Sequence, residues 1–145
     1  MSFGGPLLLA PLSSLLGIRA GMNVSILNPP EGFLEALLPL PDGASLVDTS
    51  RLGLDLQLFF TTRKTELVER LGHLTHQMAV VGAIWVAFPT VADAASVPTE
   101  DFVRLAALEM GLTDTKKVML GPAWTALKLQ YRARAPRLEA PSAEA

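Results

Sequence analysis

The residues of this sequence best suited to bind a ligand are two hydroxyls and two cations that follow one another: Thr61, Thr62, Arg63 and Lys64. They stand at the predicted start of a helix, where free N–H groups and the helix dipole attract negative charge. We therefore predict that they bind a small anionic ligand, such as a phosphate or a carboxylate. The alternative is a solvated helix start, with Thr62 as N-cap and the cations paired with Glu66 or Glu69.

A second candidate is the segment Asn28-Pro29-Pro30, which follows a predicted strand. It is similar to the Asn-Pro-Pro-aromatic motif of amino-group methyltransferases. However, Glu31 stands where that motif needs its aromatic side chain, and the sequence has no glycine-rich cofactor loop. The simpler interpretation is a helix cap, with Asn28 as N-cap and both prolines in the first turn. Because proline has no N–H to offer a phosphate, the loop is unsuited to a nucleotide.

Three residues stand beside or at the ends of predicted strands, where they could line a pocket: Asn28, Thr90 and Trp124. Ligands of α/β sheets bind outside the carboxyl ends of the strands, which makes these positions candidates. Trp124 could line a pocket near the turn of a predicted hairpin. Packing in the core is the alternative for Trp124 and for Trp85, which lies between small residues in the central apolar run.

The sequence offers little for metal binding or catalysis. Glu69, His73 and His76 share one helical face, but this face lies opposite the apolar stripe and is expected to meet water. We predict no metal there. No Ser-His-Asp arrangement and no pair of carboxylates suited to acid–base chemistry is recognisable, so we assign no catalytic residue and no cofactor.

Half of the lysines and arginines lie in the last part of the chain: Lys116, Lys117, Lys128, Arg132, Arg134 and Arg137. In the last predicted strand, polar and apolar residues alternate, which predicts one wet and one covered face. Cations on such a strand protect a sheet edge from aggregation. The alternative is a docking surface for an acidic partner or for a second subunit.

The composition limits the possible partners and compartments. A chain of 145 residues, 50% of them apolar, is the size of one domain with its own core. A formal net charge of -2 provides no basic field for nucleic acid, so we predict no nucleic-acid partner. The absence of cysteine excludes disulfides and thiol chemistry and suits a cytoplasmic protein. The longest apolar run is too short to span a membrane, and the leucine-rich stretch 6–18 is expected to form a short helix that ends at Gly17.

The unbroken apolar run Met78 to Phe88 predicts a central strand that is covered on both faces. Leu54–Phe60 carries Asp55 and Gln57 on its second face, so we expect this strand to be only partly covered and nearer to an edge. The remaining strands are predicted at Met22–Leu27, Ala44–Val47, Thr115–Leu120 and Thr125–Tyr131. The main helices are predicted at Pro29–Leu38, Thr62–Gln77 and Thr99–Met110.

This order of elements predicts an α/β fold, a three-layer αβα sandwich with a mainly parallel, twisted, Rossmann-like sheet. Gly121 and Pro122 separate the last two strands, which are expected to form a C-terminal antiparallel hairpin. We expect residues 1–132 to form a single domain. Residues 133–145, rich in Pro, Ala and Glu, are expected to be a mobile tail.

Four segments of the chain carry a family resemblance: Leu16–Gly21, Pro30–Phe33, Ala83–Pro89 and Trp124–Lys128. They resemble an uncharacterised bacterial family, number 3052 in the domain-of-unknown-function series, over about residues 14 to 132. The chain departs from the family pattern at Thr90, where a lysine often follows the proline, and at Gly121-Pro122-Ala123, where acidic residues commonly precede the tryptophan. The resemblance implies a small cytoplasmic α/β domain and assigns no role to any residue.

The sequence leaves two hypotheses for the function. The first is a non-enzymatic domain that binds a small ligand or a protein and self-associates, most simply as a dimer. The second is an enzyme of methyltransferase-like or nucleotide-using ancestry with an unfamiliar site. Cofactor binding distinguishes them, because only the enzyme requires it.

Overall fold

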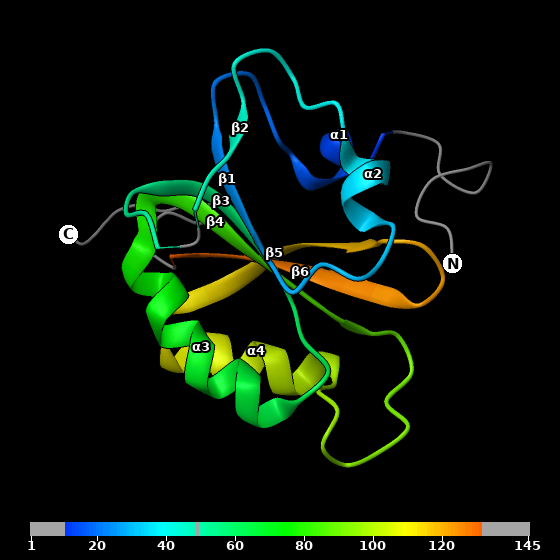
Figure 1. Ribbon diagram of the computed structural model, residues 1–145. Helices are drawn as coiled ribbons and strands as arrows, with labels where there is room; N and C mark the ends of the chain where they lie inside the picture. The colour runs from blue at the N-terminus through cyan, green and yellow to red at the C-terminus, as the bar shows by residue number, and fades with distance from the viewer. Residues whose placement is uncertain (1–10, 49, 132–145) are drawn as a thin grey trace.

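The computed structural model describes residues 11–48 and 50–131, which contain one six-stranded sheet of order β2-β1-β3-β4-β6-β5 (Figure 1). The strands are β1 (Asn23–Leu27), β2 (Ser45–Leu46), β3 (Leu54–Phe60), β4 (Met78–Pro89), β5 (Leu112–Met119) and β6 (Trp124–Tyr131). The first four strands pair in parallel, whereas β6 runs antiparallel to both β4 and β5. The predictions of an α/β fold and of a C-terminal antiparallel hairpin are confirmed. The predicted tail, residues 133–145, lies outside the described residues.

The helices cover both faces of the sheet, because each face of a largely buried sheet must meet an apolar partner. They are α1 (Leu12–Leu16), α2 (Phe33–Leu37), α3 (Lys64–Gln77) and α4 (Glu100–Glu109). α1 and α2 pack on one face around Trp85, and α3 and α4 pack on the other face around Phe59. Figure 1 shows the two helix pairs on opposite sides of the strands. No helix among the described residues is both long and apolar enough to cross a membrane.

β4 is the central strand, and it is buried on both faces from Gly82 to Phe88, as its apolar run predicts. Its first part is different, because the pairing with β3 shifts between Leu54 and Leu56. The shift leaves Val80 and Val81 each 65% exposed. A Cβ at Gly82 would lie 2.7 Å from the carbonyl oxygen of Leu54, so only glycine fits this close approach of the two strands.

The prediction that β3 is only partly covered on one side and lies nearer to an edge than β4 is wrong, since each of the two is the third strand from its edge of the sheet. β3 lies between β1 and β4, and Gln57 is buried at 1% exposure. The amide of Gln57 donates to the carbonyl oxygen of Leu74 at 2.8 Å, near the end of α3. Asp55 accepts a hydrogen bond from the backbone N–H of Asn23 at 2.8 Å. A polar side chain in a strand can be buried when a backbone group forms a hydrogen bond with it. The sequence pattern does not reveal such a partner, so it cannot distinguish a buried polar face from a solvent-exposed one.

The two long helices follow their sequence signals. The predicted stripe of α3 is buried at Leu67, Leu71 and Leu74. The hydroxyl of Thr99 accepts from the backbone N–H of Phe102 at 3.2 Å, which confirms Thr99 as the N-cap of α4. The prediction for the second helix is too long by several residues, since α2 covers only Phe33–Leu37.

Candidate functional site

The strand order reverses at β1, which has β2 on one side and β3 on the other. The carboxyl ends of β1 and β3 therefore border the crevice where sheets of this kind bind ligands. Asn28 directly follows β1, and Thr61 directly follows β3. The structure thus brings together one residue from each of the two predicted groups of site residues.

Glu66, in the first turn of α3, joins the two strand ends. Its Oε2 accepts from Nδ2 of Asn28 at 3.0 Å, and its Oε1 accepts from the hydroxyl of Thr61 at 2.8 Å. Nδ2 of Asn28 also donates to the carbonyl oxygen of Phe60 at 3.3 Å. A carboxylate near a helix N-terminus is favourable on its own, so Glu66 supplies an internal anion at the place where a ligand anion was expected.

The interpretation of Asn28 as a helix cap is wrong. Its φ of 56° is left-handed, a conformation that asparagine tolerates better than most residues. Its side chain is bonded to β3 and α3 and caps nothing. The cap position of α2 is instead Gly32, whose φ of 85° favours glycine.

The four predicted anion-binding residues separate in space. Thr61 is buried at 2% exposure and bonded to Glu66, whereas Thr62 and Arg63 are exposed. The cap position of α3 is Arg63, without a side-chain cap bond, so the alternative of Thr62 as N-cap is wrong. Lys64 turns toward α4, with its ammonium 5.0 Å from the ring centre of Phe102.

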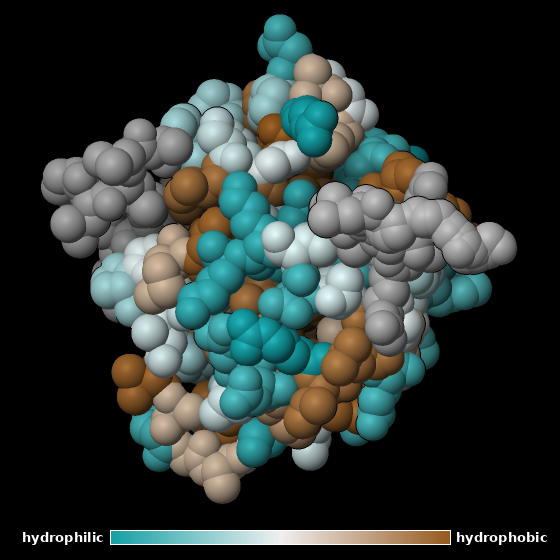
Figure 2. Space-filling model, turned by 180° about the vertical axis from the view of Figure 1, so that it is seen from behind, coloured by the Kyte–Doolittle hydropathy of each residue, from teal (hydrophilic) through white to brown (hydrophobic). Residues whose placement is uncertain are grey.

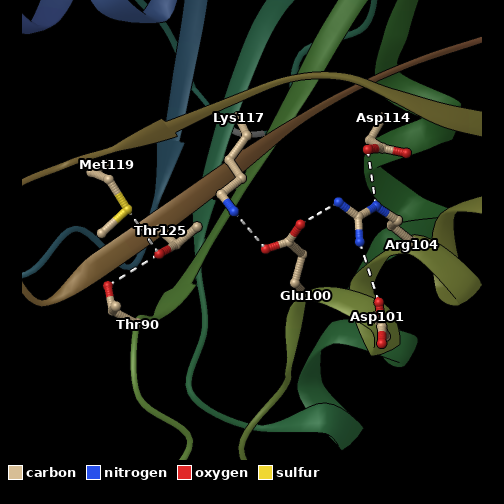
Figure 3. A network of polar contacts seen from close by, with 8 residues as sticks. All are labelled: Thr90, Glu100, Asp101, Arg104, Asp114, Lys117, Met119 and Thr125. Atoms are coloured by element: carbon tan, nitrogen blue, oxygen red, sulfur yellow. Dashed lines mark hydrogen bonds and ion pairs between the residues drawn. The ribbon is translucent and has the colours of Figure 1, made fainter.

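Thr90 and Trp124 lie side by side at the other strand ends, because Pro89 at the end of β4 pairs with Trp124 at the start of β6. The hydroxyls of Thr90 and Thr125 are 3.1 Å apart. Figure 3 shows the two side chains pointing toward each other. The half-buried ring of Trp124 contacts the ring of Phe60 edge-on, with centres 5.0 Å apart. Trp124 is therefore held by aromatic packing at the edge of the core.

A groove between α3 and α4 is the feature that the sequence analysis missed. Its cavity of about 280 Å³ is lined by Val68, Leu71, Phe102, Leu105, Ala106, Glu109 and Met110. A more open cavity shares two of these residues and is lined by Lys64, Thr65, Val68, Glu69 and Phe102. Figure 2 shows apolar side chains at the surface over this part of the molecule. In the sequence, Val68 and Leu105 are apolar residues that lie outside the buried stripes of their helices, and this could have indicated the groove. In the structure their side chains are 56% and 63% exposed.

An ionic network ties α4 to the hairpin, as Figure 3 shows. The guanidinium of Arg104 contacts Glu100, donates to Asp114 at 3.0 Å and to Asp101 at 3.2 Å, and Lys117 donates to Glu100 at 3.0 Å. The hydrogen bond from Lys117 and the contact with Arg104 hold the pKa of Glu100 below its usual value. Within residues 11–48 and 50–131, no three His, Cys, Asp or Glu side chains are grouped as metal ligands.

Solved structures support the fold alone, because their sequence identities are low. A possible exported protein from Bordetella parapertussis is 16% identical with a TM-score of 0.56 over 81% of this chain and 65% of that one. A SAM-dependent methyltransferase from Aquifex aeolicus is 11% identical with a TM-score of 0.52 over 80% and 85%. The magnesium protoporphyrin IX methyltransferase of Synechocystis, solved with bound SAM, is 11% identical with a TM-score of 0.52 over 83% and 74%.

The chain spans 65% of the length of the Bordetella protein and 49% of that of the mitomycin 7-O-methyltransferase MmcR. No curated protein matches the sequence. A family model does match residues 43–133, which include β2 to β6, α3 and α4. The chain therefore belongs to the family described as "Protein of unknown function (DUF3052)", as its sequence segments predict.

Proposed function

We propose that this protein is a non-enzymatic domain that binds a small anionic ligand with an apolar body in the groove between α3 and α4. The observation that carries this proposal is the apolar cavity of about 280 Å³, which adjoins a second cavity lined by Lys64. An apolar ligand body would cover Val68 and Leu105, and its anionic group would meet Lys64. Exposed Arg63 and Thr62 at the start of α3 are the further anion contacts.

The bridge between the strand ends supports a role other than methyl transfer. Glu66 accepts hydrogen bonds from both Asn28 and Thr61 where a cofactor of such a sheet would lie. Moving Glu66 aside would break both hydrogen bonds to its carboxylate, each worth about 1.5–3 kcal/mol. Pro29 and Pro30 also remove two N–H donors from the loop after β1.

The fold of the methyltransferase neighbours favours a second candidate, an enzyme of methyltransferase-like or nucleotide-using ancestry. In this case Asn28, Thr90 and Trp124 would line the site at the carboxyl ends of the strands, and Glu66 would move aside. The two candidates use different surfaces, so ligand binding distinguishes them.

The proposal is tested by thermal unfolding with decanoate, with the uncharged decanol and with SAM. A ligand at a hundred times its dissociation constant adds about 2.7 kcal/mol of stability. We expect decanoate to raise the midpoint more than decanol, and Leu105→Gln to abolish both effects. Lys64→Gln should lower the effect of decanoate to that of decanol.

Val91→Gln is the matched control, since Val91 is 74% exposed and does not line the groove. Stabilisation by SAM that Leu105→Gln leaves unchanged would favour the enzyme. Equal responses of Leu105→Gln and Val91→Gln to decanoate would overturn the groove as the binding site.

We further propose that residues 1–132 act as one three-layer, Rossmann-like domain and that the protein is cytoplasmic and dimeric. The exposed side chain of Leu108 on α4, which does not line the groove, supports self-association. Sedimentation velocity tests it, with a concentration-dependent dimer expected and Leu108→Gln weakening the dimer.

A further inference from the structure

Two lysines of the β5–β6 hairpin face each other, and neither is paired with a carboxylate of the described residues. Lys116 of β5 is directly opposite Lys128 of β6, so both side chains lie on the same face of the sheet. Lys128 is also opposite Trp85 of β4, whose ring belongs to the core under α1 and α2. Like charges at directly opposite positions destabilise a sheet, unless an anion lies near them.

The ammonium of Lys128 is held at the end of α1. It lies 6.0 Å from the ring centre of Trp85, and a Cβ at Gly17 would be 3.7 Å from it. Trp85 is fully buried, and its Nε1 donates to the carbonyl oxygen of Leu16 at 2.8 Å. The ammonium of Lys128 thus lies near an aromatic ring that is itself fixed, and its charge is partly shielded from water.

Arg19, two residues after Gly17, adds a third positive charge. Partial burial of the ammonium, and then the charges of Lys116 and Arg19, lower the pKa of Lys128 below its usual value. Among residues 11–48 and 50–131, no carboxylate lies within ion-pair distance of any of these three cations. The cluster therefore presents uncompensated charge on the face that carries α1.

We propose that Arg19, Lys116 and Lys128 form a binding site for a multiply charged oxyanion of the phosphate class, such as a phosphate monoester. Three neighbouring cations suit a dianion, because charge-assisted hydrogen bonds to phosphate oxygens are strong and a bound anion offsets the repulsion between the lysines. The site lies on the opposite face of the sheet from the groove of α3 and α4. It therefore goes beyond the proposed function and stands or fails separately from it.

The test is calorimetric titration with inorganic phosphate at constant ionic strength and neutral pH. Lys128→Met keeps a side chain of similar shape on Trp85 and removes the charge, and it should weaken phosphate binding about tenfold or more. Lys117→Gln is the matched control, because Lys117 lies on the same hairpin but is paired with Glu100. This control should bind phosphate as the parent protein does.

Arg19→Gln and Lys116→Gln provide second variants that leave the core untouched, and each should weaken binding in the same direction. Acetate, with a single charge, should bind more weakly than phosphate. The proposal is overturned if millimolar phosphate gives no binding heat, if Lys128→Met and Lys117→Gln bind alike, or if acetate equals phosphate. Thermal unfolding of each variant shows that it is folded before titration.

Discussion

The lysines on the two faces of the β5–β6 hairpin differ in whether a carboxylate is paired with them. On the face of α3 and α4, Lys117 is bonded to Glu100, which contacts Arg104 in a continuous network (Figure 3). On the face of α1, Lys116 and Lys128 oppose each other without a carboxylate among the described residues. The carboxylates of one face thus offset its lysine, whereas the two lysines of the other face have no carboxylate partner among the described residues.

The same contrast separates the strand ends from the helical groove. At the carboxyl ends of β1 and β3, Glu66 accepts from Asn28 and Thr61 and bridges the two strand ends. Between α3 and α4, Val68 and Leu105 stay exposed beside an open cavity. In both comparisons, the better candidate for ligand binding is the surface whose charged or apolar side chains are not paired with or covered by other described residues.

The largest effect is expected from Trp85→Ala. Trp85 is fully buried, fixes the end of α1 through Leu16 and lies under Lys128. Its loss should lower the free energy of unfolding by about 3–5 kcal/mol, measured by urea denaturation. Trp124→Ala is the comparison, since Trp124 is only half-buried and should cost less. Equal losses at the two positions would contradict the anchoring role of Trp85.

A smaller effect is expected from Arg104→Met, which breaks the ionic network between α4 and the hairpin. The variant should lose about 1 kcal/mol of stability, because exposed ion pairs contribute little singly and somewhat more in a network. The loss should shrink at high salt, where exposed charges are screened. Lys116→Gln should show no such loss. If it destabilises the protein as much as Arg104→Met does, the two faces are not different.

Lys128→Met should leave stability unchanged or raise it slightly in buffers without phosphate. The substitution removes a partly buried charge and its repulsion from Lys116 and Arg19, while the methionine still covers Trp85. Urea denaturation at low salt measures the change. A clear loss of stability would mean that Lys128 has a stabilising partner, which would weaken the case for an anion site.

The smallest effect is a difference in pH dependence between the two faces. Folding lowers the pKa of Lys128, so the charged lysine destabilises the folded protein at neutral pH. This destabilisation disappears as the pH rises from the lowered pKa toward 10.5. The stability of the parent protein relative to Lys128→Met should therefore rise in this window.

On the other face, the pKa of Glu100 is lowered, so the stability that its carboxylate contributes is present above pH 4.5 and is lost as the pH falls through the folded-state value. Denaturation midpoints of parent, Lys128→Met and Glu100→Gln proteins across both windows check the two signs.

Much of the fold was predictable, because its signals are local. The apolar run of β4, the stripe of α3 and the capping residue Thr99 each determine structure through their own neighbours in the sequence. The partial cover of β3 was predicted wrongly, since a carbonyl of α3 satisfies Gln57 and makes its burial possible.

The sequence by itself determined the α/β class, the hairpin, the family and the list of candidate cations. Only the tertiary structure decided which charges are compensated. Glu66 reaches Asn28 across 38 positions in the chain, and Lys128 reaches α1 through Trp85, so neither relation is written in local spacing. The physical reason is that charge compensation acts through space over a few ångströms, whereas sequence patterns report only neighbours along the chain.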